Sequence, residues 1–181
     1  FGNYHNKEKS ELLTVKELTN LSIYQIAKFK SSNANVDSVI IDGLNLPKKY
    51  PEVSHNNDTR ILWNGPDICI VVSSDLSIKE KLSSINDDDF AVTDISHSRA
   101  IIEISGLHAI DVLKKGTPLN LNNSEFTKNN CANSSYNGIS FMLDFIDDQP
   151  LTFRLFCLRS FGGSFYHSIT DSALEYGFIG E

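Results

Sequence analysis

The stretch that decides the fold is Ser105-Gly106-Leu107-His108-Ala109-Ile110-Asp111-Val112-Leu113-Lys114-Lys115-Gly116, followed by Thr117-Pro118-Leu119-Asn120-Leu121. It predicts the end of a strand, then a helix that begins near Ser105 or Gly106, and finally an apolar corner. Lys114 and Lys115 fall in the last turn of this helix, where cations are favoured, and Gly116 suits its carboxyl-terminal cap. The three-residue spacing of Leu107, Ile110 and Leu113 predicts one buried stripe.

The rest of the chain has the composition of an ordinary globular protein. It has 181 residues, of which 40% are hydrophobic and 22% charged, and a chain of this length can bury a sizeable core. We expect an amino-terminal arm over residues 1–20, with a short helical signal at 11–18, and a single α+β domain over residues 21–181.

Alternation of apolar and polar residues, or short apolar runs, predicts a series of strands. The expected strands cover residues 21–29, 60–67, 68–72, 90–95, 99–104, 139–146 and 151–158, and the 60–72 pair forms a hairpin across Gly65-Pro66. Helices are expected at 78–85, where Ser77 and Glu80 suggest a capping box, at 105–116 and at 160–176. Residues 48–59 and 122–137 are predicted to be loops. Seven strands and three helices indicate an α+β fold with a mostly antiparallel sheet.

Charge and cysteine content exclude several classes of protein. The net charge of −7 argues against a nucleic-acid surface, which needs clustered Lys and Arg. The longest apolar run, Ile68–Val72, has far fewer than the roughly 20 residues that span a bilayer, so no membrane association is expected. Cys69, Cys131 and Cys157 lack the spacing of a disulfide framework or a zinc site. We expect a cytoplasmic protein.

Candidate chemistry is sparse. Gly162-Gly163-Ser164-Phe165-Tyr166 approaches the G-x-S-x-G nucleophile elbow, but Tyr166 stands where the last glycine belongs. The alternatives are an anion site at the start of the following helix, over Ser160–Ser164, and glycines that permit close helix–strand packing, which we favour. Glu103 and Asp111 are acid–base candidates only if they face a pocket.

Metal and cofactor signatures are missing from the sequence as well. The five histidines do not show the spacing of a metal site; they are His5, His55, His97, His108 and His167. No dinucleotide fingerprint and no P-loop occurs. We therefore assign no catalytic, cofactor-binding or metal-ligating residue to this chain.

Two aromatic residues are the candidates for an interface. Trp63, the sole tryptophan, is either an anchor at a protein interface, where Trp is enriched, or a core residue. Phe161, Phe165, Ile169 and Ala173 recur every four residues and predict the buried face of the last helix. Tyr166 lies beside that face and is the better surface candidate.

Three segments, in this order, resemble the gamma subunit of heterotetrameric sarcosine oxidase. They are Ile61–Asp67, the stretch from Val92 through Gly106 to Leu121, and Leu158–Phe161 with the helix that leads to Gly177. The first is similar to a strand-and-turn signature that this subunit shares with the glycine-cleavage aminomethyltransferase (T-protein). The sequence departs from the family at Ile68-Cys69-Ile70, where Glu-Trp-Leu is usual, and at Gly162, Gly163 and Tyr166.

The resemblance implies a T-protein or folate-binding-like fold and a non-catalytic, structural or assembly role. The complex would demethylate sarcosine oxidatively to glycine and transfer the one-carbon unit to tetrahydrofolate. FAD, FMN, NAD, tetrahydrofolate and zinc would be bound by the partner alpha, beta and delta subunits. Alternatives are the same role in an N-methylglutamate or dimethylglycine dehydrogenase complex, or a stand-alone folate-binding protein. The richness in Asn, Lys, Ile and Ser suggests a bacterial source.

Overall fold

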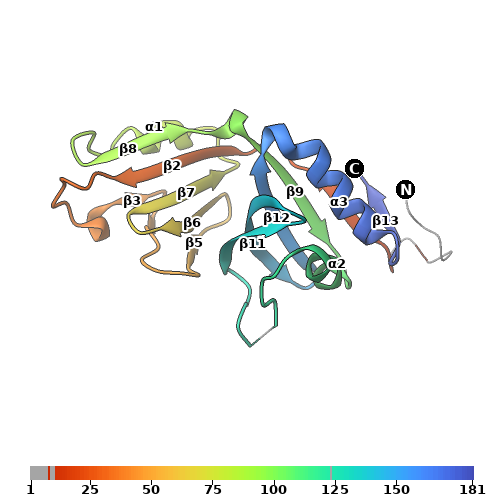
Figure 1. The fold of residues 1–181 in the computed structure, drawn as a ribbon. Coiled ribbons are helices and arrows are strands. Elements are labelled where there is room, and N and C mark those ends of the chain that lie inside the picture. Colours follow the sequence, from red (N-terminus) through yellow and green to blue (C-terminus); the bar gives the residue numbers. More distant parts are fainter. Residues whose placement is uncertain (1–7, 9–10, 123) are drawn as a thin grey trace. The chain divides into compact units, whose positions relative to one another are not determined.

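The computed structural model describes residue 8, residues 11–122 and residues 124–181 (Figure 1). The chain divides into two compact units. Unit 1 comprises Phe1–Thr19 and Ser98–Glu181, and unit 2 comprises Asn20–His97. This division differs from the single domain expected over residues 21–181, because the start of the chain packs with the carboxyl-terminal half.

Unit 1 is built on a six-stranded sheet in the order β10-β11-β12-β9-β1-β13. The bounds are β1 (Leu13–Glu17), β9 (Arg99–Ser105), β10 (Cys131–Tyr136), β11 (Ile139–Asp148), β12 (Leu151–Leu158) and β13 (Phe178–Gly180). Neighbouring strands are antiparallel except for β1 and β13, which are parallel. The mostly antiparallel sheet predicted from the sequence is therefore correct for this unit.

Two helices pack on the unit 1 sheet, α2 (Ala109–Gly116) and α3 (Gly162–Ala173). A 3₁₀ turn, η4 (Arg159–Phe161), leads into α3. Three of the four residues predicted for the buried face of the last helix, Phe165, Ile169 and Ala173, are completely buried. Phe161 is the exception, because it lies in η4 before the helix begins and is 48% exposed. The three buried side chains share one core with alternate residues of β9, β11 and β12, so the four-residue period placed the helix correctly.

Helix α2 begins later than its sequence predicts. Gly106 adopts a φ of +130°, in the region that favours glycine, and a Cβ there would lie 3.1 Å from Leu13 Cδ2. The chain turns through Leu107 and His108 before the helix starts at Ala109. Leu107 is consequently 78% exposed, and the buried residues of the helix are Ala109, Val112 and Leu113.

Two segments of unit 1 were assigned wrongly from the sequence. Residues 11–18 carry no α-helix; Leu13–Glu17 is a strand, and its buried Leu13 and Val15 alternate with partly exposed residues as strand residues do. The expected arm thus contains a sheet strand, while its residues 1–7, 9 and 10 lie outside the described part of the chain. Cys131–Tyr136, expected to be a loop, pairs with β11 along its whole length. Three successive polar residues in this strand concealed it.

Unit 2 contains a five-stranded antiparallel sheet in the order β5-β6-β7-β2-β8. The bounds are β2 (Ser22–Lys28), β5 (Val53–His55), β6 (Thr59–Gly65), β7 (Ile68–Ser73) and β8 (Phe90–Asp94). The predicted strands at 21–29, 60–72 and 90–95 are confirmed, as is the hairpin across Gly65-Pro66. β5 lies in a segment that was predicted to be a loop.

Three short elements complete unit 2: helix α1 (Ile78–Leu82), the hairpin β3 (Ile40–Ile41) and β4 (Leu44–Asn45), and the 3₁₀ turn η2 (Val36–Ser38). A second 3₁₀ turn, η3 (Ser96–Ser98), follows β8. The predicted capping box at Ser77 does not form, because its hydroxyl donates to Asp75 instead. No helix formed by the described residues is long and apolar enough to cross a membrane.

An ionic network centred on Lys81 joins the short elements of unit 2. Its ammonium nitrogen lies 2.5 Å from Asp42 Oδ1 and 2.6 Å from Asp75 Oδ2. Asp42 forms the two-residue turn between β3 and β4 with Gly43, and both have positive φ, at 54° and 77°. Thr59 Oγ1 donates to Asp42 Oδ2 over 2.8 Å. The hydrogen bond from Lys81 is the main reason that the pKa of Asp42 falls from 3.8 to about 2.

Asp42→Asn tests this network without disturbing the turn, since Asn also tolerates a positive φ. A carboxylate with a depressed pKa stabilises the fold at pH values above its unfolded-state pKa. That contribution is lost as the pH falls from about 4 towards 2. We expect the variant to lose about 1 kcal/mol of unfolding free energy at pH 7. The loss is small because water screens the ion pair between Lys81 and Asp42. Urea titrations at pH 7 and pH 2 check this; an equal deficit at both values would contradict the ionic assignment.

Candidate functional site

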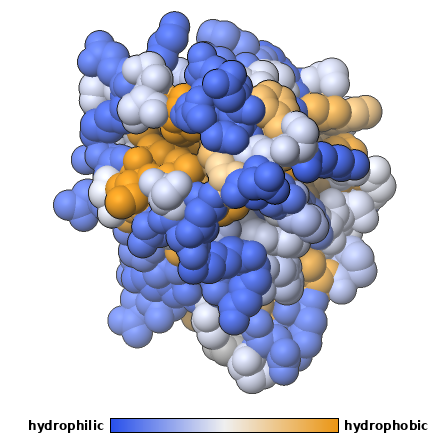
Figure 2. Space-filling model, turned by 90° about the vertical axis from the view of Figure 1, so that its left-hand side faces the viewer, coloured by the Kyte–Doolittle hydropathy of each residue, from blue (hydrophilic) through white to orange (hydrophobic). Residues whose placement is uncertain are grey.

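The first candidate site is a cavity at one end of the unit 2 sheet. Helix α1 has five residues and spans about 7 Å, whereas strands of six or seven residues extend for roughly 20 Å. The helix therefore covers only part of its sheet face. Beyond it, where β2 ends and β7 begins, lies a cavity of about 230 Å³. This end of unit 2 faces the viewer in Figure 2, where apolar atoms gather within a hydrophilic border.

The cavity is apolar inside and carries charges of both signs around it. Its apolar lining comes from the sheet and from the segment after β4, and consists of Ile26, Leu46, Pro47, Trp63, Ile68 and Phe90, together with Val36 and Cys69. Lys28, Asp37, Lys48 and Asp67 also line it. Lys48 Nζ and Asp37 Oδ1 form an ion pair of 2.8 Å. At about 230 Å³ the cavity lies below the usual 300–1,000 Å³ of small-molecule sites, so it suits an inserted side chain better.

Trp63 is neither fully buried nor fully exposed. Its ring lines the cavity and meets the ring of Tyr50 edge-on, with 6.0 Å between ring centroids and an interplanar angle of 73°. Tyr50 is 51% exposed and lies in a segment that the sequence predicted to be a loop, so nothing in the sequence pattern singled it out. The structure thus places an aromatic pair, of which Tyr50 is the exposed member, beside an apolar cavity.

The second candidate, Tyr166, lies in unit 1. It lines a groove of about 410 Å³ with Glu17, Ala100, Ile102, Arg159, Gly162, Gly163 and Glu181. The phenol packs against β13, because a Cβ at Gly180 would lie 2.8 Å from Tyr166 Oη. Tyr166 is partly buried and supports the contact between α3 and the sheet. Its neighbour Phe161 is 48% exposed.

Acid–base candidates are held in ion pairs. Glu103 on β9 lies opposite Lys16 on β1 and opposite Arg154 on β12. Its carboxylate accepts from Lys16 Nζ and from Arg154 Nε, both at 2.9 Å. Burial raises the pKa of Glu103, but the two hydrogen bonds and the positive charges of Lys16 and Arg154 together lower it more, so its pKa lies below the usual range. A carboxylate held in this way is ionised and acts as a structural anion.

The second carboxylate, Asp111, pairs with His108 Nδ1 over 2.9 Å. The His108 ring stacks on Tyr176 with 4.5 Å between ring centroids. Lys115 Nζ lies 4.6 Å from the centroid of the same Tyr176 ring and 2.6 Å from Glu175 Oε2. This cluster fastens α2 to the segment after α3, which gives these residues a packing role.

The two glycines at the start of α3 differ in how closely other atoms approach them. A Cβ at Gly162 would lie 3.0 Å from Ala100 Cβ, whereas one at Gly163 would meet nothing within 4 Å. Close helix–strand packing therefore accounts for Gly162 alone. Ser164 is exposed, and no histidine among the described residues hydrogen-bonds to it. Within the same residues, no group of three His, Cys, Asp or Glu side chains is arranged to hold a metal ion.

Comparison with known proteins gives a relative that matches over most of both chains. No family model matches the chain. The gamma subunit of sarcosine oxidase from Corynebacterium sp. (strain U-96) is 23% identical over 167 residues, which cover 91% of this chain and 80% of that subunit. The resemblance predicted from three segments is thus confirmed, and it extends beyond them over almost the whole sequence.

Solved structures show the same fold. A chain of heterotetrameric sarcosine oxidase from Corynebacterium sp. U-96, in complex with pyrrole 2-carboxylate, matches with a TM-score of 0.82 and 23% identity, covering 92% of this chain and 86% of that one. The glycine cleavage system aminomethyltransferase T from Bartonella henselae matches with a TM-score of 0.64 and 7% identity, covering 95% of this chain but 48% of that one. The predicted α+β, T-protein-like fold is therefore confirmed.

Glu103→Gln tests whether this carboxylate is structural. The amide keeps the size of the side chain but removes the charge that pairs with Lys16 and Arg154. We expect a loss of about 2 kcal/mol in unfolding free energy at pH 7, as hydrogen bonds to charged groups contribute roughly 1.5–3 kcal/mol. The loss should shrink as the pH falls through 4, since protonation neutralises the wild-type carboxyl as well. Denaturant titration measures both; unchanged stability at pH 7 would refute the structural role.

Proposed function

We propose that this chain is a non-catalytic assembly subunit, of gamma type, in a heterotetrameric sarcosine oxidase. The complex would demethylate sarcosine oxidatively to glycine and pass the one-carbon unit to tetrahydrofolate. The observation that carries the proposal is the similarity to the gamma subunit of a sarcosine oxidase over 91% of this chain. The similarity in sequence and fold covers 80% and 86% of the matched chains, which favours a similar place in an assembly.

The arrangement of charged side chains supports a role without chemistry of its own. Glu103, Asp111 and Asp42 each pair with a cation or a histidine inside the fold. A catalytic group must lie within hydrogen-bonding distance of a substrate. The oxygens of these carboxylates are instead paired with side chains of the fold. Exposed apolar side chains, by contrast, remain on both units, such as Leu76 at 93% and Leu107 at 78% exposure. Such side chains suit contacts with other chains.

The proposal assigns the reaction to the partners. Alpha-, beta- and delta-type subunits would bind FAD, FMN, NAD, tetrahydrofolate and zinc, and this chain would bind none of them. Trp63 and Tyr166 are the proposed interface residues. Of the two, Trp63 has the more suitable surroundings, because interface anchors are aromatic side chains that sit in or beside pockets.

Capture of the assembly from the native host tests the function. The tagged chain should bring down several larger chains, identified by mass spectrometry, and the eluate should show flavin absorbance. It should oxidise sarcosine faster than N-methylglutamate or dimethylglycine. Preference for one of those two amines would instead assign the chain to an N-methylglutamate or dimethylglycine dehydrogenase complex. A colourless, solitary chain would refute the subunit role, and folate binding by that isolated chain would favour a folate-binding protein.

Substitution of Trp63 tests the proposed anchor. Trp63→Ala should weaken the capture of partner subunits at least tenfold, because truncating an aromatic hot spot costs about 2 kcal/mol or more. Trp63→Phe, which keeps a ring, should have a much smaller effect. Circular dichroism verifies that each variant is folded. Wild-type capture by Trp63→Ala would exclude an anchoring role.

A further inference from the structure

Strand β8 is an outer strand of the unit 2 sheet. β8 pairs with β2 on one side, and no other strand of described residues pairs with it. The other outer strands differ: β5 and β13 have three residues each. The fourth, β10, has the segment after α2 beside it, since Thr117 Oγ1 lies 3.0 Å from Ser134 Oγ.

The register shows which backbone groups of β8 face outward. The N–H of Ile95 donates to Ile23 O, and the N–H of Phe29 donates to Asp89 O, both at 2.9 Å. In an antiparallel pair, residues at odd and even positions alternate between facing the neighbour and facing away. The N–H and C=O groups of Val92 and Asp94 therefore point away from β2.

Neither face of this strand end is covered. Successive side chains of a strand point to opposite faces, yet Val92, Thr93 and Asp94 are all exposed, with Val92 at 38%. Val92 is β-branched and suits pairing with a further strand. An uncovered outer strand with free backbone groups is a template for the addition of a strand from another chain.

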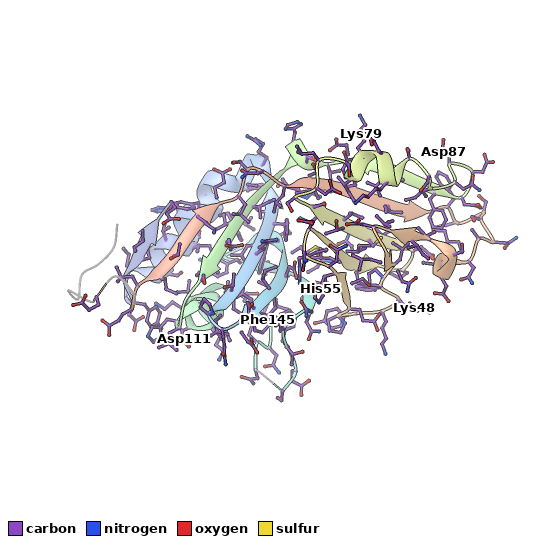
Figure 3. All side chains as sticks on the ribbon, turned by 180° about the vertical axis from the view of Figure 1, so that it is seen from behind. Lys48, His55, Lys79, Asp87, Asp111 and Phe145 are labelled. Atoms are coloured by element: carbon purple, nitrogen blue, oxygen red, sulfur yellow. The ribbon has the colours of Figure 1, made fainter. Side chains whose placement is uncertain are left out.

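The charges around β8 decide what kind of strand fits. Asp87, Asp88 and Asp89 precede the strand and Asp94 ends it. Lys79 is a cation whose charge acts on Asp94. Asp87 and Lys79 both lie on the side of unit 2 that carries α1 and β8 (Figure 3). With Lys79 counted, the four aspartates leave this edge negative.

Self-association through this edge is disfavoured by the same charges. Antiparallel pairing of two β8 strands about Val92 would bring Asp94 of each copy towards the Asp87–Asp89 run of the other. Like charges opposite one another across a strand pair are destabilising. A strand that carries Lys or Arg avoids this repulsion and gains attraction instead.

We propose that the free edge of β8 accepts an extended, basic segment of a partner chain as an added strand. The backbone groups of Val92 and Asp94 supply the hydrogen bonds, and the aspartates select Lys- or Arg-bearing partners. If the proposed subunit role is right, this edge is one of the contacts through which the chain joins its complex. The inference about the edge itself does not depend on that role.

Val92→Pro removes the outward N–H while sparing the ladder to β2, so the fold of unit 2 should persist. Val92→Thr, which keeps the N–H and the β-branched shape, is the matched control. The probe is a fluorescent peptide of alternating Lys and Val, compared with one of alternating Glu and Val. We expect the wild-type chain to bind the Lys-Val peptide and to ignore the Glu-Val peptide. Val92→Pro should weaken binding at least tenfold, and Val92→Thr less than threefold.

The double variant D87K/D88K separates charge from pairing, and should weaken Lys-Val binding at least fivefold at low salt with less effect at high salt. In captured complexes, Val92→Pro should also lower the yield of partner chains. If the wild-type chain captures no partner, the proposed subunit role is wrong. The peptide-binding result still tests whether the edge of β8 accepts an added strand. Failure of the wild type to bind the Lys-Val peptide, or equal binding by Val92→Pro, overturns the inference.

Discussion

The pairing of β1 on both of its sides is the constraint on which unit 1 depends. This strand lies between β9 and β13, antiparallel to the first and parallel to the second. The sheet is therefore complete only when the beginning and the end of the described chain meet, with Asn20–His97 as an excursion between β1 and β9. Contacts between residues so far apart in sequence impose a large loop-closure entropy on folding. Buried Leu13 and Val15 offset part of that cost through the core they share with α2 and α3.

Polar pairing follows the same strands. Across β1, β9 and β12 the register sets Lys16, Glu103 and Arg154 in a row, so the anion lies between two cations. Continuing the row, Asp144 on β11 stands opposite Arg154. Ion pairs of this kind gain little over apolar packing, but they penalise any register in which one charge loses its partner. A shift of one residue would also turn Leu13 and Val15 out of the core. The row therefore specifies register more than it adds stability.

The sequence predicted the elements whose apolar pattern is regular and missed those whose burial depends on partners. The apolar residues of β2, of the β6–β7 hairpin and of α3 form patterns that predict these elements. β10 was missed because it contains three successive polar residues, Asn133, Ser134 and Ser135. The site was predicted only in part. Trp63 stood out as the sole tryptophan, but its cavity forms because the segment around Leu46 packs on the sheet end that the short helix α1 leaves open. Such packing depends on tertiary distances that no local pattern encodes, as does the pairing of Glu103 with strands on either side.

In both units, some charged groups form internal pairs and some apolar groups remain exposed on the surface. In each unit some carboxylates form ion pairs with cations of the same unit, as with Asp42 and Lys81 or Glu103 and Arg154. The surface also offers exposed apolar side chains, an aromatic pair beside a cavity, and the outer backbone edge of β8 with its aspartates. Association between chains uses apolar anchors and main-chain pairing, and chemistry uses poised titratable groups. Exposed apolar side chains and an outer strand with accessible backbone groups suit the binding of other chains, which agrees with the place proposed for this chain in an oxidase complex.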